Sequence, residues 1–214
     1  MVIRLTLHHP VGGHTIPHLS SPSTSILGLG LTPYHTLLTI FAFTAALKQI
    51  IWQLFISEQK MPATFALIVA AFNTFLNTVN TAVSLHSWTS PAGSTSSALP
   101  IGTALFFTGI GVELVSEIQR KIFKAQKKNQ GRPYGGGLWA YATNINYGGY
   151  TLWRAGYACV AGRLGWGGLV GAFVGSDFMN RAIPSMDRYC EGRYGREWVR
   201  IRERTRWKLI PGLC

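Results

Sequence analysis

Amide, hydroxyl and glycine residues gather in one stretch of the chain, residues 135–156. The stretch reads Gly-Gly-Gly-Leu-Trp-Ala-Tyr-Ala-Thr-Asn-Ile-Asn-Tyr-Gly-Gly-Tyr-Thr-Leu-Trp-Arg-Ala-Gly. Glycine leaves backbone N–H groups accessible, and asparagine and tyrosine add side-chain donors and acceptors. These are the groups that a bound polar cofactor needs. The same composition also suits a membrane-entry turn, with glycine for close packing and aromatic rings at the interface.

Polar residues also recur along the apolar run of residues 62–85, at Asn73, Asn77, Asn80 and Ser84. Their spacing of four, three and four residues places them on one face of a helix. Inside a membrane such a face must turn toward protein or a wet cavity. Two interpretations stay open: hydrogen bonds between helices, or a cavity wall that binds a polar part of the substrate. On the second interpretation the cavity comprises Asn73, Asn77, Asn80 and Trp153.

Three charged residues, Lys48, Glu113 and Arg154, lie inside apolar runs. A lysine there costs about 2.5–3.5 kcal/mol on insertion scales unless it finds a partner or water. We therefore predict that all three point into a bundle of helices. Glu113 has two open roles: it is a counter-ion for Lys48 or Arg154, or it is an acid in a reaction. Glu117 and Arg120 have the spacing of a local ion pair.

These residues require helices long enough to hold them in a membrane. Of the 214 residues 47% are hydrophobic and 13% are charged, and this charged fraction is about half that of a soluble domain. Apolar runs occupy residues 37–56, 62–85, 100–120, 147–161 and 166–179. A bilayer core of about 30 Å needs about 20 helical residues, so the last two runs are short. We predict an all-α polytopic membrane bundle of about five transmembrane helices, in which residues 32–214 form a single domain.

Residues 1–31 are rich in Gly, Pro, Ser and His, and this composition predicts a mobile N-terminal arm. The arm contains His8, His9, His14 and His18, which have no helical or hairpin spacing and no acidic partner, so we expect no metal site. The three cysteines form no CxxC pair. No stretch has the composition of a cleavable signal peptide, so membrane entry depends on the first span.

The net charge of +12 is unevenly distributed along the chain. Six of the 20 lysines and arginines lie in residues 120–132 and nine lie in residues 181–208, directly beside apolar runs. Basic segments in this position mark the cytosolic side of a membrane and attract anionic lipid headgroups, so we expect membrane lipids rather than nucleic acid as partners. We predict a helical, cytosolic C-terminal tail, a lumenal N-terminus and location in the endoplasmic reticulum.

A family resemblance rests on Gly137, Leu138 and Trp139, followed after a spacer by Asn146, Tyr147 and Gly149. This pattern resembles the C-terminal signature of the steroid 5-alpha-reductase-like membrane enzymes, in the branch labelled DUF1295. The tail has similar features at Asp187-Arg188-Tyr189, Tyr194-Gly195, Glu197-Trp198 and Leu209-Ile210-Pro211. The resemblance covers about residues 113–214 well and the first two helices loosely.

The resemblance implies NADPH as cofactor and assigns its binding to Asn144, Asn146, Tyr147, Tyr150, Arg120 and Lys124. The chain departs from the family pattern at Thr143 and Asn144, which replace Arg-His, and at Tyr150, which replaces Glu. In the family those residues help to hold the dinucleotide. A charge-assisted hydrogen bond contributes about 1.5–3 kcal/mol, so we expect weak NADPH binding or none.

The activity that the resemblance implies is reduction of a carbon–carbon double bond next to a carbonyl in a lipophilic substrate. Hydride adds to the β-carbon, and a donor stabilises the charge that develops on the carbonyl oxygen. The candidates for catalytic roles are Glu113, Tyr147 and Asn77. The alternatives are a cofactor-independent isomerase or cyclase on the same scaffold, a methyltransferase, because isoprenylcysteine methyltransferases have a similar C-terminal pattern, and a non-catalytic membrane protein.

Overall fold

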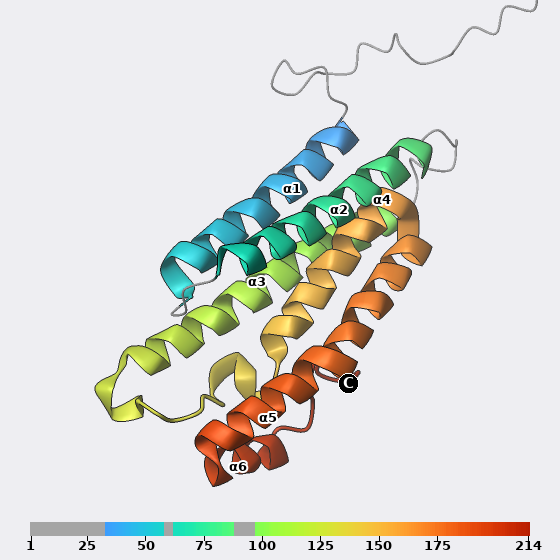
Figure 1. The fold of residues 1–214 in the computed structure, drawn as a ribbon. Coiled ribbons are helices and arrows are strands. Elements are labelled where there is room, and N and C mark those ends of the chain that lie inside the picture. The colour runs from blue at the N-terminus through green and yellow to red at the C-terminus, as the bar shows by residue number, and fades with distance from the viewer. Residues whose placement is uncertain (1–32, 58–61, 88–96) are drawn as a thin grey trace, which may run out of the picture. The chain divides into compact units, whose positions relative to one another are not determined.

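The computed structural model describes residues 33–57, 62–87 and 97–214, and the predicted N-terminal arm lies outside these ranges. The chain divides into two units, residues 1–36 and residues 37–214, and the second unit contains almost all of the described structure. Its elements are α1 (Pro33–Ile51), η2 (Trp52–Ile56), α2 (Ala63–Ser87), α3 (Ala98–Ala125), η4 (Lys127–Asn129), η5 (Gly137–Ala140), α4 (Ile145–Asp177), η6 (Phe178–Ala182), α5 (Ile183–Tyr194) and α6 (Arg196–Arg204) (Figure 1). The described residues contain no strand, so the predicted all-α class is confirmed.

Four helical segments among the described residues are long and apolar enough to cross a membrane: Tyr34–Ile56, Ala66–Leu85, Ala98–Ala125 and Ile145–Tyr194. The last of these has 50 residues, far more than the about 20 that one crossing needs. Its helix breaks at Gly162 and Arg163, where Arg163 has φ 70°, and the chain reverses direction there (Figure 1). The two predicted short spans are therefore the two halves of α4, joined at Gly162 and Arg163.

Glycine allows α3 and the first half of α4 to pack with their backbones in contact. A Cβ atom on Gly109 would lie 2.6 Å from the carbonyl oxygen of Gly149, and one on Gly156 would lie 2.6 Å from that of Gly102. These four glycines form one seam along the two helices, because they repeat every seven residues on each of them. In the second half of α4, Gly171 lies against Ala155 of the first half, whereas Gly168 has no neighbour within 4 Å.

Aromatic rings fill the space where α1 meets the glycine seam. Phe41 of α1 is fully buried and stacks on Phe106 of α3 with ring centroids 3.9 Å apart. Tyr157 and Trp153 of α4 meet the ring of Phe106 edge-on. The centre of the unit is therefore the α3–α4 pair, with α1 on one side, and the second half of α4 folds back on the other side through Ala158, Val170 and Val174.

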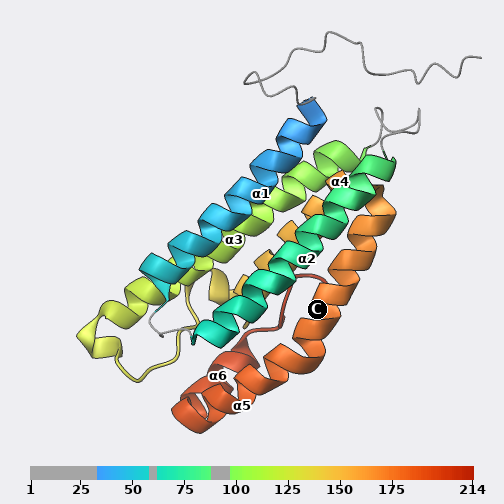
Figure 2. The same cartoon turned by 45° about the horizontal axis from the view of Figure 1, so that its top comes forward.

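The C-terminal segment returns to the start of α4 after α5 and α6 (Figure 2). The backbone N–H groups of Thr143 and Asn144 donate to the carbonyl oxygens of Trp207 and Lys208, at 3.0 and 2.9 Å. Leu209 is 1% exposed and its carbonyl lies directly against Gly148. The end of the chain therefore closes over the segment that leads into α4.

Replacement of Gly109 by alanine is expected to destabilise the chain by about 1–3 kcal/mol, because the new methyl group overlaps the backbone of α4. Gly111→Ala is the matched control: a Cβ there meets nothing within 4 Å, and alanine is the better helix former. Thermal unfolding in detergent checks both variants. Equal midpoints for the two would contradict the proposed role of the seam.

Candidate functional site

The centre of the polar interior is an ion pair between α1 and α3. Lys48 Nζ lies 2.7 Å from Glu113 Oε1, and the side chains are 4% and 14% exposed. Both residues lie within helices that are long enough to cross the membrane. The prediction that Lys48 and Glu113 point into the bundle is confirmed, and of the two counter-ions considered for Glu113 the structure selects Lys48.

An indole from α4 completes the surroundings of this carboxylate. Trp153 Nε1 donates a hydrogen bond to Glu113 Oε2 at 2.7 Å, so each carboxylate oxygen has its own donor. The Lys48 ammonium also lies 5.2 Å from the Trp153 ring centre and 5.6 Å from that of Tyr150. The Glu113 side chain is thus held in place from two helices, with aromatic faces beside its partner Lys48.

A second cation, Arg154, lies one turn from Tyr150 on α4 and is 1% exposed. Its Nη1 donates to Asn77 Oδ1 at 3.1 Å, its Nε donates to the Tyr150 hydroxyl at 3.1 Å, and its Nη2 donates to Asn73 Oδ1. Asn80 of the same polar face accepts a hydrogen bond from Trp166 Nε1 at 2.9 Å. The three asparagines therefore make the interhelical hydrogen bonds that one of the two sequence interpretations required. That these asparagines also bind a polar part of the substrate stays a prediction.

A third polar cluster surrounds Glu117, one turn along α3 from Glu113 and 2% exposed. Its Oε1 accepts a hydrogen bond from Asn146 Nδ2 at 2.8 Å. Its Oε2 lies 2.5 Å from Arg120 Nη2 and 3.3 Å from Trp52 Nε1. The predicted Glu117–Arg120 pair is therefore present, and Asn146, a residue expected at the cofactor site, is hydrogen-bonded to it. The other amide atom of this residue, Asn146 Oδ1, is buried without a hydrogen-bond partner among the described residues.

Thr143 and Asn144, at the positions of the family's Arg-His, lie beneath the C-terminal segment. They are 4% and 2% exposed, and Asn144 Nδ2 donates to Thr143 Oγ1 at 3.1 Å. With their backbone N–H groups bonded to the C-terminal segment, these positions face protein. The expected cofactor contact at Asn144 is therefore not accessible in this conformation.

The remaining predicted cofactor residues are separated. Tyr147 stacks on Phe178 of η6 with ring centroids 4.6 Å apart, whereas Tyr150 belongs to the Arg154 cluster. Lys124 donates to the Tyr194 hydroxyl at 2.9 Å and to the carbonyl of Arg132 at 2.7 Å. The Arg120 side chain is 39% exposed and pairs with Glu117.

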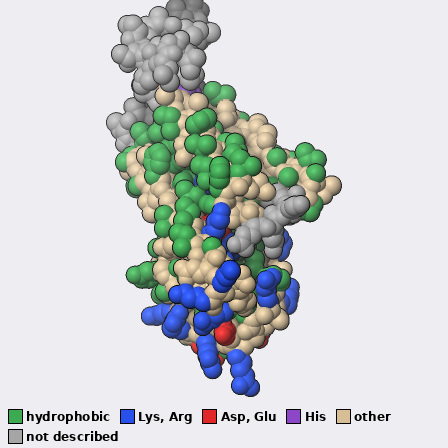
Figure 3. Space-filling view, turned by 90° about the vertical axis from the view of Figure 1, so that its left-hand side faces the viewer, with side chains coloured by type: hydrophobic (Ala, Val, Ile, Leu, Met, Phe, Trp, Pro, Cys, Tyr) green, Lys and Arg blue, Asp and Glu red, His purple; other side chains and the backbone are tan. Residues whose placement is uncertain are grey.

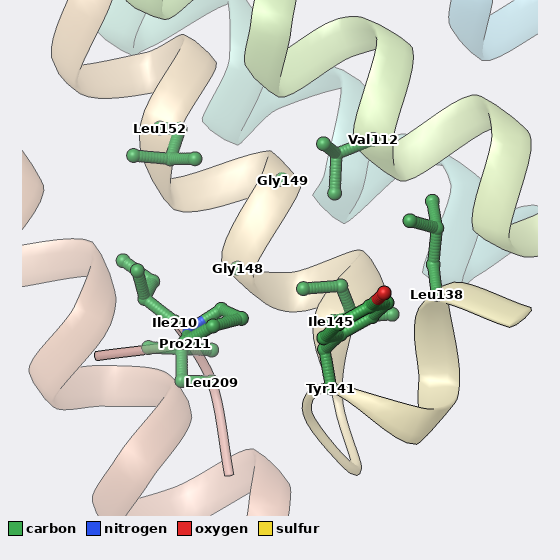
Figure 4. A pocket seen from close by; sticks show the side chains of 10 residues that line it. All are labelled: Val112, Leu138, Tyr141, Ile145, Gly148, Gly149, Leu152, Leu209, Ile210 and Pro211. Atoms are coloured by element: carbon green, nitrogen blue, oxygen red, sulfur yellow. The ribbon is translucent and has the colours of Figure 1, made fainter. Parts of the chain in front are cut away.

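Two pockets formed by described residues contain no predicted site residue in their lining. The first, about 320 Å³, is formed by α3, η5, the start of α4 and the C-terminal segment, and its lining residues are Val112, Leu138, Tyr141, Ile145, Gly148, Gly149, Leu152, Leu209, Ile210 and Pro211 (Figure 4). It uses the face of α4 that carries Gly148 and Leu152, opposite the face with Tyr150 and Trp153. The second, about 520 Å³ and open, lies between Leu37 and the residues of α3 around Thr103.

Sequence reasoning missed Trp52, Trp166 and Phe178. Trp166 and Phe178 contact the predicted site residues Asn80 and Tyr147, and Trp52 contacts Glu117 of the predicted ion pair. A signal for Trp52 exists in the sequence. Lys48 and Trp52 are four residues apart, as are Glu113 and Glu117, so two packed helices can match both pairs at once. No comparable signal identifies Phe178, because its contact depends on the reversal of α4. Among the described residues no group of His, Cys, Asp and Glu could hold a metal ion.

The chain matches a protein family and a known relative. Residues 46–180 match the model of the family described as "Protein of unknown function (DUF1295)". A protein of Ustilaginoidea virens named "Probable O-methyltransferase ustE" is 35% identical over 211 residues, which cover 93% of this chain and 73% of that relative. No solved structure matches. The family match includes Lys48, Glu113 and Arg154 and ends before α5, so the segment that covers Thr143 and Asn144 lies outside it.

Lys48→Met alone is expected to destabilise the chain by about 3–5 kcal/mol, because it leaves the Glu113 carboxylate buried and unpaired. The double variant Lys48→Met/Glu113→Gln should recover most of this loss, because it removes both charges and keeps an acceptor for Trp153. Thermal unfolding in detergent measures both. A double variant as unstable as the single one would show that packing at Lys48, and not its charge, sets the loss.

Proposed function

The chain belongs to the DUF1295 family, and from this premise we propose that it is an integral membrane enzyme that moves a proton on a lipophilic carbonyl substrate. The observation that carries the proposal is the Glu113 carboxylate, held between Lys48 Nζ and Trp153 Nε1 at 2.7 Å each. A buried ion pair of this kind is a weak source of stability compared with apolar packing. Charged groups inside membrane spans more often serve a function.

In the proposed reaction Glu113 takes a proton from a carbon next to the substrate carbonyl. The Lys48 ammonium donates a hydrogen bond to the oxygen on which negative charge develops. Return of a proton from Glu113, after exchange with solvent, to a different carbon shifts the double bond, which is an isomerisation. Attack of the enolate carbon on a second carbonyl or enone carbon of the same molecule breaks the π bond at that carbon and closes a ring, and Glu113 returns its proton to the anion that results. Neither course needs an oxidant or a reductant, and proton transfer by a positioned group contributes about 10²–10⁴-fold in rate.

The state of the nucleotide-binding positions supports cofactor-independent chemistry over the NADPH-dependent reduction that the family resemblance implied. The phosphates of a bound dinucleotide need cationic partners. Thr143 and Asn144 supply none and are buried, and Lys124 is held by Tyr194 and the carbonyl of Arg132. Arg120 remains, but its guanidinium is paired with Glu117.

A second candidate, O-methyl transfer, is favoured by the name of the relative from Ustilaginoidea virens. In that reaction Glu113 would take the proton of a substrate hydroxyl while the oxygen attacks the methyl group of S-adenosylmethionine. The two candidates share the base and differ in the cofactor, so ligand binding separates them.

We further propose that the C-terminal tail lies in the cytosol and that the membrane is the endoplasmic reticulum. Lysine and arginine side chains gather at one end of the face in view, and hydrophobic side chains are spread over the rest of its described part (Figure 3). Excess basic charge at one end of a helical bundle favours the cytosolic side.

The topology is tested by labelling a cysteine placed at the exposed position Arg196 with a membrane-impermeant maleimide in sealed microsomes. We expect labelling without permeabilisation, because the tail faces the outside of these vesicles. Labelling only after detergent is added would reverse the orientation.

The reaction is tested by deuterium exchange from heavy water into a panel of lipophilic enones of different ring size, followed by mass spectrometry. We expect wild-type protein to speed exchange without any nucleotide, and the folded Lys48→Met/Glu113→Gln variant to lose about 10²-fold or more of that rate. Glu203→Gln, at an exposed position of α6, is the control and should exchange normally.

Titration with NADPH and with S-adenosylmethionine accompanies the exchange experiment. Micromolar NADPH binding, together with no exchange in the absence of nucleotide, would instead support the NADPH-dependent reductase. Micromolar S-adenosylmethionine binding and no exchange would favour the methyltransferase.

A further inference from the structure

Arg154 is a buried cation whose described hydrogen-bond partners are all neutral. Its acceptors are two asparagine amides and one tyrosine hydroxyl. No carboxylate of the described residues forms a salt bridge with it. With 1% exposure it has almost no contact with the surroundings of the chain either. An arginine in this position is costly unless a compensating charge is supplied.

The charges around it do not balance. Lys48 and Glu113 cancel each other, and Arg154 then leaves one uncompensated positive charge in the same cluster. The Trp153 ring connects the two cations: its centre lies 5.2 Å from Lys48 Nζ and 4.3 Å from Arg154 Cζ. Aromatic faces and amide oxygens stabilise a guanidinium only in part. The interior therefore favours a ligand with a negative charge.

The guanidinium retains donors for such a ligand. Each of its three nitrogens donates one hydrogen bond to a described residue, and the two terminal nitrogens each carry a second N–H. Paired N–H groups in a plane match a carboxylate, or the two oxygens of an acidic enol, in a bidentate arrangement. An amide oxygen matches this geometry less well.

The helix that supplies the amide oxygens is the one with the least buried surface. Of the span Ala66–Leu85 in α2 only 6% is buried, and Leu67 and Phe75 are 69% and 64% exposed. Asn73 and Asn77 are thus acceptors on a helix that contacts lipid over most of its surface. A charged oxygen of a ligand that enters from the bilayer can replace these neutral acceptors with a stronger partner.

We propose that Arg154 is the binding site for an anionic oxygen of the substrate, which makes the substrate class a lipophilic carboxylate or acidic enol. This rests on the proposed function and adds the substrate's charge to it. Arg154 holds the anionic oxygen, and Glu113, which is hydrogen-bonded to Trp153 Nε1, acts on a nearby carbon. Asn73 and Asn77 hold the guanidinium when no substrate is bound.

The test compares 11-(dansylamino)undecanoate with its methyl ester, each titrated into purified protein in nonionic detergent while energy transfer from tryptophan to dansyl is recorded. We expect the acid to bind wild-type protein at least tenfold more tightly than the ester, after correction for partition into empty micelles. Arg154→Gln should bind the two equally. The control Arg196→Gln removes an exposed cation of α6 and should keep the preference, which excludes a general effect of net charge.

Asn77→Asp provides a test that does not depend on removal of the arginine. It places a carboxylate at the atom that Arg154 Nη1 already contacts at 3.1 Å. We expect this variant to unfold at a higher temperature than wild type and to lose the preference for the acid, because the internal carboxylate takes the site. Equal binding of acid and ester by wild type, or an unchanged preference in Asn77→Asp, would overturn the proposal.

The result is separable from the proposed reaction. Lys48→Met/Glu113→Gln leaves Arg154 and its partners in place, so it should keep the preference for the acid while it loses exchange. If wild-type protein prefers the acid but does not speed exchange, the proposed reaction is wrong and the proposed anion site still stands. If it speeds exchange but does not prefer the acid, the proposed anion site is wrong and the proposed reaction still stands.

Discussion

Charged groups in an apolar environment must find partners, and this requirement organises the interior of the chain. Lys48, Glu113 and Arg154 come from three different helices, and together with their partners they hold α1, α2, α3 and α4 in one arrangement. The ion pair joins α1 to α3, the indole of Trp153 joins α4 to the same carboxylate, and the asparagines join α2 to α4. Because desolvation of an unpaired charge is costly, each of these contacts restricts the register of the helices.

The close approach of α3 and α4 makes those contacts possible. Where Gly109 faces Gly149 and Gly102 faces Gly156, the helices pack with no side chain between them. Trp153 is thereby brought near enough for its Nε1 to donate to Glu113 at 2.7 Å. Small residues allow this approach in membranes, where association depends on packing and hydrogen bonds more than on the hydrophobic effect. The glycine seam and the polar cluster thus depend on the same pair of helices, α3 and α4.

The C-terminal segment covers the positions at which this chain departs from the family signature. Asn146 and Tyr147 keep the residue types of the family signature, but Thr143 and Asn144 are bonded to the backbone at Trp207 and Lys208. Thr143 and Asn144 are uncharged and buried, and they find neutral hydrogen-bond partners within the protein, as buried polar groups usually do. The proposed cofactor-independent reaction relies on the interior carboxylate and needs no contact at this surface.

The sequence by itself determined the helical class, the membrane-spanning segments, the turn inside the last of them and the inward direction of Lys48, Glu113 and Arg154. These follow from local periodicity, apolar length and the cost of charge in lipid, which act within one segment. Spacing also showed that Asn73, Asn77 and Asn80 share a face. The family resemblance was visible in a short run of residues around Trp139 and Asn146.

Only the tertiary structure decided which partners these groups take. Glu113 had two candidate cations, and the choice of Lys48 depends on how α1 packs across α3. The asparagine face had two interpretations, and its hydrogen bonds to Arg154 and Trp166 depend on the reversal of α4 at Gly162. The burial of Asn144 depends on residues more than 60 positions away, which α5 and α6 bring back to the start of α4. Such pairings involve residues distant in sequence, and local pattern carries no information on which of several compatible surfaces will meet.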